Sequence, residues 1–408
     1  MRIAISTTGS DGDVLPFLTL ARALERAGHT VWLVAPGEYL EAARGLRLFE
    51  TGTPPRRVAA QGPLPDSPNP VERMRIRAAD FADTLLPTVG NVVEAVRGAD
   101  LVVHHHMDLP AYAAATVHRL PRISGWIAGI PWVELSPRPE RSVRAIYRAY
   151  DRGYWWLQYR IANRHLNSVL EAAGLPPKRD VTAELFRADR VLLAVSPTVA
   201  PRRRSWPDQL ELTGFWYEES PSYSPSDELL RFLDAGEPPV VACFGSTQLA
   251  EPRRWSEALV SGILSAGRRA IVVGGHAALD AAGRGENVFW APRIPFDWLF
   301  ERASAALHHG GAGTTALALR AGIPQAVAWH VSDQPRWAAT VHRLGVGARP
   351  CKPRNFSARW VRDATIACTE DVRLIEAARG LGEVIRKENG VSSAVRSIER
   401  FARSRGLT

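Results

Sequence analysis

Several residue types are scarce in this chain of 408 residues, and each shortage excludes a class of protein. Its three cysteines, Cys243, Cys351 and Cys368, are too few and too scattered for a disulfide framework or a cysteine-based metal cluster. Long apolar runs are also missing, since none approaches the roughly 18 residues that cross a bilayer. The first residues, MRIAISTTGSDGD, lack the apolar segment of a signal peptide, so a cytoplasmic location is expected.

Lysine is almost absent, with 3 Lys against 48 Arg in a chain of net charge +9. This bias, together with abundant Ala, is typical of a GC-rich genome. The positive charge is uneven, because residues 131–210 contain 14 basic and 8 acidic residues. The sequence shows no zinc-ligand spacing, and its basic residues do not form a pattern with aromatic or base-reading side chains. No nucleic-acid partner is therefore expected.

Short apolar runs alternate with amphipathic stretches along the chain, which predicts parallel, doubly wound α/β sheets. Residues 217–227 (YEESPSYSPSD) are rich in Pro and Ser and are predicted to be a linker. We therefore expect two Rossmann-like domains, residues 1–216 and 228–390, that face a central ligand-binding cleft. The predicted strands are residues 2–6, 31–34, 101–104, 191–195, 240–244, 270–273, 305–308 and 325–328, and the predicted helices include residues 14–27, 255–265, 313–321 and 336–344.

The most informative stretch is HHGGAGTT at residues 308–315, between a predicted strand and a predicted helix. Glycines permit a close backbone approach, and the free amides at a helix N-terminus attract phosphate. A plain tight turn between strand and helix is the alternative interpretation. Asp333 and Gln334 follow the next predicted strand and offer a carboxylate and an amide, which suit sugar hydroxyls.

HHGGAGTT, RAGIPQ and DQPRW together resemble the donor-binding motif of the family 1 glycosyltransferases, which use nucleotide sugars. GSDGDVLPFLTLARALERAGHTV is similar to the opening motif of the family's bacterial antibiotic and sterol branch. FLDAGEPPVVACFGS, LTGFW and PFDWLF look most like the sterol glucosyltransferases. The resemblance keeps its order over nearly the whole chain. It implies the two-domain GT-B fold and a C-terminal helix, within residues 391–408, that crosses back to the first domain.

The resemblance also implies where a nucleotide-sugar donor would bind. One loop and one helix N-terminus would hold its diphosphate, and a carboxylate and an amide would hold the hydroxyls of its sugar. The residues expected at the diphosphate are Gly245, Ser246, His309, Gly311, Gly313 and Thr314, and those at the sugar are Asp333 and Gln334.

Several positions depart from the family's pattern. Asp11 stands where the opening motif has Arg, and Leu317 stands where plant members have a ribose-binding Glu. Arg293 stands where many relatives have a Trp that stacks on the base. A guanidinium also stacks on a flat ring, so Arg293 remains a donor-binding candidate. His330 stands where sterol-type relatives often have an aromatic side chain, which leaves the identity of the sugar open.

Asp13 lies between the first predicted strand and the first predicted helix. In the family, the Asp of this motif is the general base that deprotonates the acceptor hydroxyl, and the transfer inverts the anomeric carbon. The alternative is a structural role for Asp13 as the N-cap of the helix. The D-x-D pattern at residues 11–13 resembles a metal motif of a different fold and is interpreted as coincidence, so neither a metal nor another cofactor is expected.

The acceptor is expected on the N-terminal domain. Residues 140–170 form a predicted basic helix rich in Tyr and Trp, which could pack on that domain, line an apolar acceptor pocket or touch a membrane surface. The histidines at 104–106 cannot all face one metal ion, because neighbours on a strand point to opposite faces. They are expected to line the cleft instead. The candidate acceptor-binding residues are Gly12, His106, Trp126, Trp132, Trp155 and His330.

The favoured hypothesis is an inverting transferase that moves a sugar from a UDP- or dTDP-sugar to a hydroxyl of an apolar natural product or sterol-like lipid. Its expected location is cytoplasmic, with peripheral contact to the inner face of the membrane. A nucleotide-sugar 2-epimerase shares the architecture but needs acid/base residues on both faces of one sugar. A non-catalytic glycosyltransferase-like helper is the third alternative, although such proteins often lose the donor residues that this chain keeps.

Overall fold

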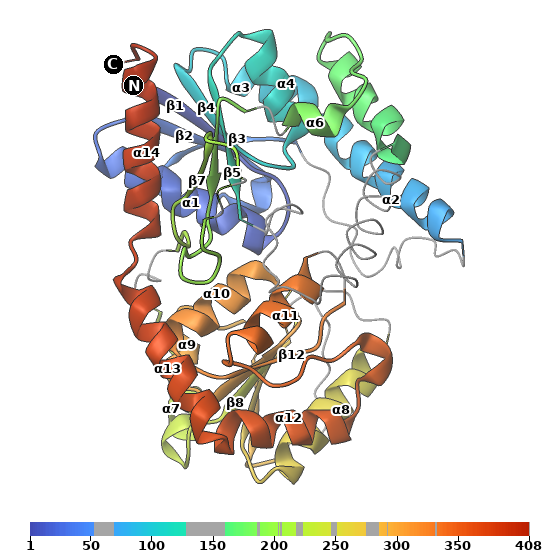
Figure 1. Ribbon diagram of the computed structural model, residues 1–408, viewed down its shortest axis with the longest axis vertical. Coiled ribbons are helices and arrows are strands. Elements are labelled where there is room, and N and C mark those ends of the chain that lie inside the picture. The colour runs from blue at the N-terminus through green and yellow to red at the C-terminus, as the bar shows by residue number, and fades with distance from the viewer. Residues whose placement is uncertain are drawn as a thin grey trace.

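The computed structural model describes residues 1–52, 69–127, 160–185, 188–202, 204, 206–217, 223–245, 251–274, 285–291, 293–330 and 333–407. Within these residues the chain forms two parallel sheets, one in each half, with helices packed on their faces (Figure 1). Two doubly wound α/β units are the predicted fold class, which the structure confirms.

The N-terminal sheet contains seven described strands in the order β3-β2-β1-β4-β5-β6-β7, all of them parallel. The order reverses between β1 and β4, which creates a switch point at the carboxyl ends of these two strands. The strands are β1 (Arg2–Ser6), β2 (Thr30–Ala35), β3 (Arg47–Glu50), β4 (Leu101–His105), β5 (Arg122–Trp126), β6 (Arg190–Leu193) and β7 (Leu210–Leu212), and the helices are α1 (Asp11–Arg26), α2 (Pro70–Leu85), α3 (Val89–Ala95), α4 (Leu109–Val117) and α6 (Val181–Leu185).

The C-terminal sheet repeats this plan with five described strands in the order β10-β9-β8-β11-β12. Its switch point lies between β8 and β11. The strands are β8 (Val240–Cys243), β9 (Ala270–Val273), β10 (Val288–Ala291), β11 (Ala305–His308) and β12 (Gln325–Val327), and the helices are α7 (Asp227–Asp234), α8 (Pro252–Ser265), α9 (Phe296–Phe300), α10 (Ala312–Ala321), α11 (Gln334–Arg343), α12 (Ala358–Glu370), α13 (Val372–Lys387) and α14 (Gly390–Ser404).

The central strands are apolar on both faces because helices cover both sides of a doubly wound sheet. On β1, Ile3 and Ile5 pack in one cluster with Phe17 of α1, whereas Ala4 points to the opposite face and packs with α3 and α4. Alternation along the strand therefore assigns each side chain to one of two cores.

The C-terminal helix α14 belongs to the core of the N-terminal half. Its residues Ala394, Ile398 and Phe401 are buried in the same cluster as Phe17, while α13 lies beside the C-terminal sheet (Figure 1). The chain thus returns to its first half after completing its second. Glu388, at the junction between α13 and α14, anchors this crossing by accepting hydrogen bonds from Ser196 Oγ at 2.8 Å and Thr198 Oγ1 at 2.9 Å.

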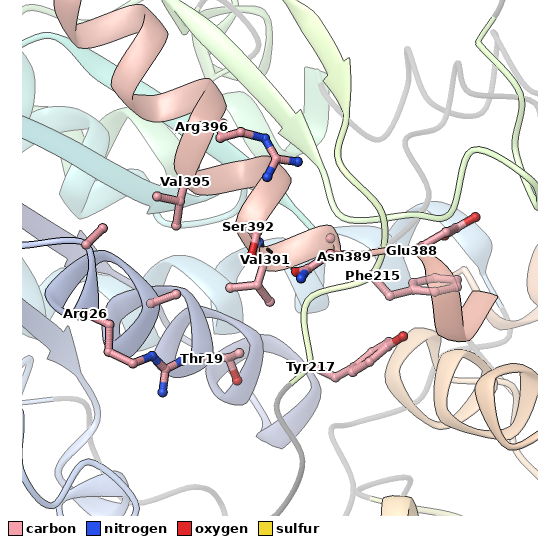
Figure 2. Close-up of a pocket in the computed structure, with 13 residues that line it drawn as sticks. Thr19, Arg26, Phe215, Tyr217, Glu388, Asn389, Val391, Ser392, Val395 and Arg396 are labelled. Atoms are coloured by element: carbon pink, nitrogen blue, oxygen red, sulfur yellow. Dashed lines mark hydrogen bonds between the residues drawn. The ribbon is translucent and has the colours of Figure 1, made fainter. Parts of the chain in front are cut away.

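The two halves also share a buried cluster. Phe215 and Val195 of the N-terminal half belong to it together with Trp337 of α11 and Ile385 of α13. Beside this cluster lies an open cavity of about 500 Å³ between α1, the segment after β7 and the start of α14 (Figure 2). The cavity contains none of the predicted site residues. The cavity lies where the chain passes between the two halves.

Element bounds agree closely with the predictions where a strand is central. Residues 2–6, 270–273 and 305–308 form strands with the predicted bounds. The helix predicted from residue 14 begins earlier, at Asp11, because Ser10 caps it. Of the predicted helix at 140–170, only the part from residue 160 lies within the described residues, and it is helical to residue 172. No described helix has the length and apolar character that a membrane span requires.

Candidate active site

Several predicted site residues, among them Asp13, Gly245 and His309, lie at the two switch points. Asp13 follows β1, and His105 ends β4, its neighbour in the N-terminal sheet. Gly245 follows β8, and His309 follows β11, its neighbour in the C-terminal sheet. In open α/β sheets ligands bind at such points, because loops after adjacent strands diverge there and leave a crevice.

Asp13 is held as an oriented carboxylate in the first turn of α1. Its Oδ2 accepts hydrogen bonds from the backbone N–H of Ser10 at 2.8 Å and from Ser10 Oγ at 2.9 Å. Ser10, rather than Asp13, is the N-cap residue of the helix, so the alternative that Asp13 is itself the N-cap is wrong. Asp13 still contributes to capping, because its carboxylate binds the N-cap backbone.

The other carboxylate oxygen of Asp13, Oδ1, faces His105 Nε2 at 3.5 Å. Burial alone would raise the pKa of Asp13, but the His105 imidazole and the Ser10 donors outweigh it and lower the pKa to about 2. Asp13 is therefore an anion at neutral pH and is available to accept a proton.

His104 and His105 end β4 and His106 follows it, and the rings of His105 and His106 contact each other with centroids 4.2 Å apart. His104 is fully buried with its Nδ1 at 2.9 Å from the His105 carbonyl oxygen, and His106 stacks on Trp126 with ring centroids 4.4 Å apart. Sequence reasoning expected all three histidines to line the cleft and chose His106 as an acceptor contact, but it did not place His105 next to Asp13. Strand pairing could have found it, because Leu101 and Val103 share the α1 face with Ile3 and Ile5, and His105 continues that row.

His309 lies between two glycines of the C-terminal half. A Cβ on Gly245 would lie 2.8 Å from His309 Cε1, and one on Gly311 would lie 2.5 Å from His309 Nε2. Gly245 also has a φ of +55°, a conformation that side chains disfavour. Burial lowers the pKa of His309 to about 3, and the neighbouring His308 and His330 contribute to the lowering, so the ring is neutral at physiological pH. Its Nδ1 has no hydrogen-bond partner within the described residues.

The adjacent His308 has a structural role. Its ring is fully buried, with Nε2 at 2.9 Å from Gln325 Oε1 and Nδ1 accepting from the Gly310 N–H at 3.0 Å. Both ring nitrogens are therefore used within the protein. Positive potential for an anion must come from elsewhere, because burial lowers the pKa of both histidines and leaves them neutral at physiological pH.

The N-terminus of α10 supplies that potential. Gly311 is its N-cap residue, and Thr315 N–H, bonded to the Gly311 carbonyl at 2.9 Å, makes the first helical hydrogen bond. The amides of residues 312–314, which include Gly313 and Thr314, precede this bond and point out of the helix end. A Cβ on Gly313 would lie 4.0 Å from Gly12 Cα, so the N-termini of α10 and α1 face each other across the site.

Asp333 and Gln334 begin α11 beside this pair of helix ends. Asp333 Oδ2 accepts from Trp337 Nε1 at 2.9 Å, and Gln334 Oε1 accepts from the His330 N–H at 2.7 Å. Burial raises the pKa of Asp333 to about 6, and the negative charge of Asp13 adds to the rise. Two carboxylates from different halves of the chain are thus close enough to influence each other. His330 itself packs against Trp255, with ring centroids 4.6 Å apart.

Arg293 connects the two halves at the mouth of the site. Its Nη2 lies 3.2 Å from Asp11 Oδ2, and Asp11 Oδ1 accepts from Tyr39 Oη at 2.9 Å. The Arg293 side chain is 75% exposed, so this pair contributes roughly 0–1 kcal/mol to stability. Base stacking by Arg293 stays a prediction.

Three predicted residues, Ser246, Trp132 and Trp155, lie outside the described residues. Trp126 is buried at the end of β5. Nowhere in the described part of the chain do three or more His, Cys, Asp or Glu side chains form a group able to hold a metal ion.

Gly311→Ala tests whether the glycines keep His309 in place. The added methyl would crowd His309 Nε2, so the ring must turn away. We expect the KM for the nucleotide-sugar donor that the resemblance implies to rise roughly 10-fold or more, since misplacement of a binding group by about 1 Å can cost as much as 100-fold. Gly380→Ala in α13, where a Cβ meets open space, is the control. Equal donor KM values in steady-state assays of both variants would contradict this role of the glycines.

The fold and the site define two doubly wound α/β units whose switch points lie close to each other, and comparison with known proteins gives the family. The chain is 33% identical to the O-mycaminosyltylonolide 6-deoxyallosyltransferase of Streptomyces fradiae, over 99% of this chain and 98% of that one. Residues 271–389 match the family described as erythromycin biosynthesis protein CIII-like, C-terminal domain. The chain belongs to the family 1 glycosyltransferases and is an enzyme of the antibiotic and sterol type.

More distant relatives share the architecture. A sterol 3-beta-glucosyltransferase of Arabidopsis thaliana is 28% identical over 97% of this chain, which spans 65% of that enzyme. The solved glycotransferase of kitacinnamycin has the same fold, with a TM-score of 0.74 at 21% identity over 98% of both chains. The glycosyltransferase VinC, solved in complex with dTDP, has a TM-score of 0.69 at 16% identity over 99% of this chain and 100% of that one.

Proposed function

We propose that this enzyme transfers a sugar from a UDP- or dTDP-sugar to a hydroxyl group of an apolar natural product or sterol-like acceptor, with inversion at the anomeric carbon. The observation that carries the proposal is the meeting of two kinds of chemistry at one site. A general-base candidate, Asp13, comes from the N-terminal half, and a phosphate-type helix N-terminus, that of α10, comes from the C-terminal half. Gly12, the neighbour of Asp13, lies close to Gly313 of α10, since a Cβ on Gly313 would lie 4.0 Å from Gly12 Cα.

The donor would bind to the C-terminal half, residues 228–390. The amides of Gly313 and Thr314 and the neutral ring of His309 donate to the diphosphate oxygens. Asp333 and Gln334 bind hydroxyl groups of the sugar, which places its anomeric carbon between the two helix ends. VinC, which has the same fold and was solved with dTDP bound, supports a nucleotide diphosphate as the ligand class.

The reaction would be a single displacement. Asp13 takes the proton of the acceptor hydroxyl as its oxygen forms a bond to the anomeric carbon. The bond from that carbon to the diphosphate oxygen breaks, and its electron pair leaves with the nucleotide diphosphate. The amides at the N-terminus of α10 stabilise the added charge, so no metal ion is required in this proposal.

The acceptor would bind to the N-terminal half, residues 1–216, with α14 packed on it. The Streptomyces fradiae 6-deoxyallosyltransferase and the Arabidopsis thaliana sterol glucosyltransferase support a macrolide-like or sterol-like acceptor. His106, which is half-buried and stacks on the buried Trp126, offers an aromatic ring to the acceptor. Contact with a membrane surface remains a prediction, because most of the basic segment 140–170 lies outside the described residues.

Donor screening by thermal shift tests the proposal. UDP-, dTDP- and GDP-sugars are compared at equal concentration, and the correct donor at about 100 Kd adds roughly 2.7 kcal/mol of stability. Mass spectrometry with macrolide and sterol acceptors then detects the sugar adduct. Sugar transfer with one of these donors is the expected result. A nucleotide sugar that changes configuration without transfer would support an epimerase instead, and binding of no donor by the protein would favour a helper function.

The pH dependence of donor use is expected to follow Asp333. Its raised pKa of about 6 means that Asp333 is a carboxylate above this pH and a neutral acid below it. Since the carboxylate is the form proposed to accept hydrogen bonds from the sugar, kcat/KM for the donor should fall roughly tenfold per pH unit well below pH 6. Asp333→Asn should give a lower but flat profile between pH 5 and 8, while exposed Asp234→Asn should keep the wild-type profile. A wild-type profile that stays flat down to pH 5 would contradict the assignment.

A further inference from the structure

His105 is a buried side chain with an unused donor directed at Asp13. Only 3% of the residue is exposed, and its Nε2 has no hydrogen-bond partner within the described residues. The acceptor that faces this atom is Asp13 Oδ1, at 3.5 Å. A buried polar atom without a partner is costly, so this geometry points to a contact that shortens during the reaction.

The other ring nitrogen determines which tautomer His105 adopts. Its Nδ1 accepts a hydrogen bond from the Met107 N–H at 3.3 Å, so Nδ1 carries no proton and the ring proton is on Nε2. Phe17 makes an edge contact with the ring, with centroids 5.7 Å apart, and limits its rotation. His105 therefore presents an N–H group, rather than a lone pair, to Asp13.

We propose that His105 is a positioning residue that holds Asp13 Oδ1 through its Nε2–H and aims this oxygen at the acceptor hydroxyl. The inference rests on the proposed function of Asp13 as the base. Oδ2 already accepts two hydrogen bonds from Ser10, so Oδ1 is the oxygen with free capacity to take the proton. His105 does not relay that proton, because protonation at Nδ1 would break its bond to Met107.

The electrostatics of Asp13 are consistent with this arrangement. Burial pushes the pKa of Asp13 upward, and the His105 imidazole is the largest influence that lowers it. Without His105, Asp13 would be less firmly ionised and free to turn about its Cβ–Cγ bond. Both changes would reduce kcat, and neither would alter the proposed contacts to the donor.

Three variants test the positioning role. His105→Ala should lower kcat by roughly 10- to 100-fold through misplacement of the base, with the donor KM nearly unchanged. His105→Gln places an amide N–H at a reach similar to that of Nε2 and should recover most of the lost kcat. His118→Gln, at the end of α4 with its Nε2 at 2.9 Å from the Val93 carbonyl oxygen, is the control for a histidine away from the site.

The outcomes separate this inference from the proposed function. If Asp13→Asn is inactive while His105→Ala has wild-type kcat, the positioning role of His105 is overturned, and Asp13 remains the proposed base. If His105→Gln is as inactive as His105→Ala and Asp13→Asn stays active, His105 is itself the base. Full activity of Asp13→Asn overturns both assignments. In each case the donor KM shows whether the donor site is intact.

A spectroscopic measurement checks the tautomer without any substrate. Nitrogen-15 histidine spectra at pH 8 should show several rings in the Nε2–H form, including those of His308 and His118. The one of these signals that disappears in His105→Gln belongs to His105. The Nδ1–H form for that ring would contradict the geometry on which the proposal depends.

Discussion

Asp13→Asn is expected to reduce kcat for sugar transfer by roughly 10²- to 10⁴-fold, the range of a general base. The amide has the same shape as the carboxylate and can still accept from Ser10, so α1 should remain capped and the protein folded. It cannot take a proton from the acceptor hydroxyl. The loss should therefore appear in kcat, measured by product formation at saturating donor and acceptor.

Donor binding should be unaffected by this substitution. Asp13 lies in the N-terminal half, whereas the proposed diphosphate and sugar contacts lie at the starts of α10 and α11. The donor Kd of Asp13→Asn should equal that of the wild type in calorimetry. Asp11→Asn is the matched control, because Asp11 is two residues away in the same turn and pairs with the exposed Arg293. Near-wild-type turnover by Asp13→Asn would remove Asp13 as the base.

Trp337→Ala is expected to lower the free energy of unfolding by about 3–5 kcal/mol, the usual effect of truncating a fully buried aromatic residue. Trp337 is completely buried in the cluster that the two halves share, and its ring centroid lies 6.3 Å from that of Phe215. Its Nε1 also donates to Asp333 Oδ2 at 2.9 Å. The substitution leaves a cavity between the halves and releases a carboxylate of the proposed sugar site.

Trp337→Phe separates the two effects. The smaller ring keeps most of the packing but cannot donate to Asp333, which costs about 1.5–3 kcal/mol for a hydrogen bond to a charged group. Urea unfolding at pH 8, where Asp333 is ionised, measures both variants. If Trp337→Ala lost less than about 0.5 kcal/mol, the size of an ordinary surface effect, the shared cluster would not join the halves as described.

The central part of the fold could be predicted because its signals are local. Buried strands such as Ala270–Val273 and Ala305–His308 are continuous apolar runs between helices, a pattern typical of a doubly wound sheet. The edge strands β3, β7 and β10 and the interior strand β5 were not predicted. Charged residues interrupt the apolar run in β3 and β7, and Ser and Gly interrupt it in β5. β10 is apolar but only four residues long and partly buried.

The close packing of glycines around the loop after β11 could be predicted because glycine positions are visible in a sequence, whereas donor binding there stays a prediction. The glycines around His309 favour a backbone that approaches a ligand closely. The structure shows a second reason for them, because a side chain on Gly245 or Gly311 would clash with the His309 ring. The contact between Asp13 and His105 could not be predicted from the sequence. It joins residues 92 positions apart, and it depends on the β1–β4 pairing and on which face of β4 each histidine takes.

The ion pair between Asp11 and Arg293 was also beyond sequence reasoning. Each residue appeared as a departure from the family's pattern, and only the juxtaposition of the two halves brings the opposite charges together. The crossing of α14 onto α1 came from the resemblance. Its physical basis is the apolar face formed by Ala394, Ile398 and Phe401, which completes the N-terminal core.

The anomeric configuration of the product is the most direct test of the central claim, that a base on one half and a diphosphate site on the other act in one displacement. The wild-type enzyme is incubated with the donor found by screening and with its acceptor, and proton NMR coupling at the anomeric position is recorded. The account predicts a glycoside whose configuration is inverted relative to the donor. A product with retained configuration, or release of free sugar without a glycoside, would contradict it.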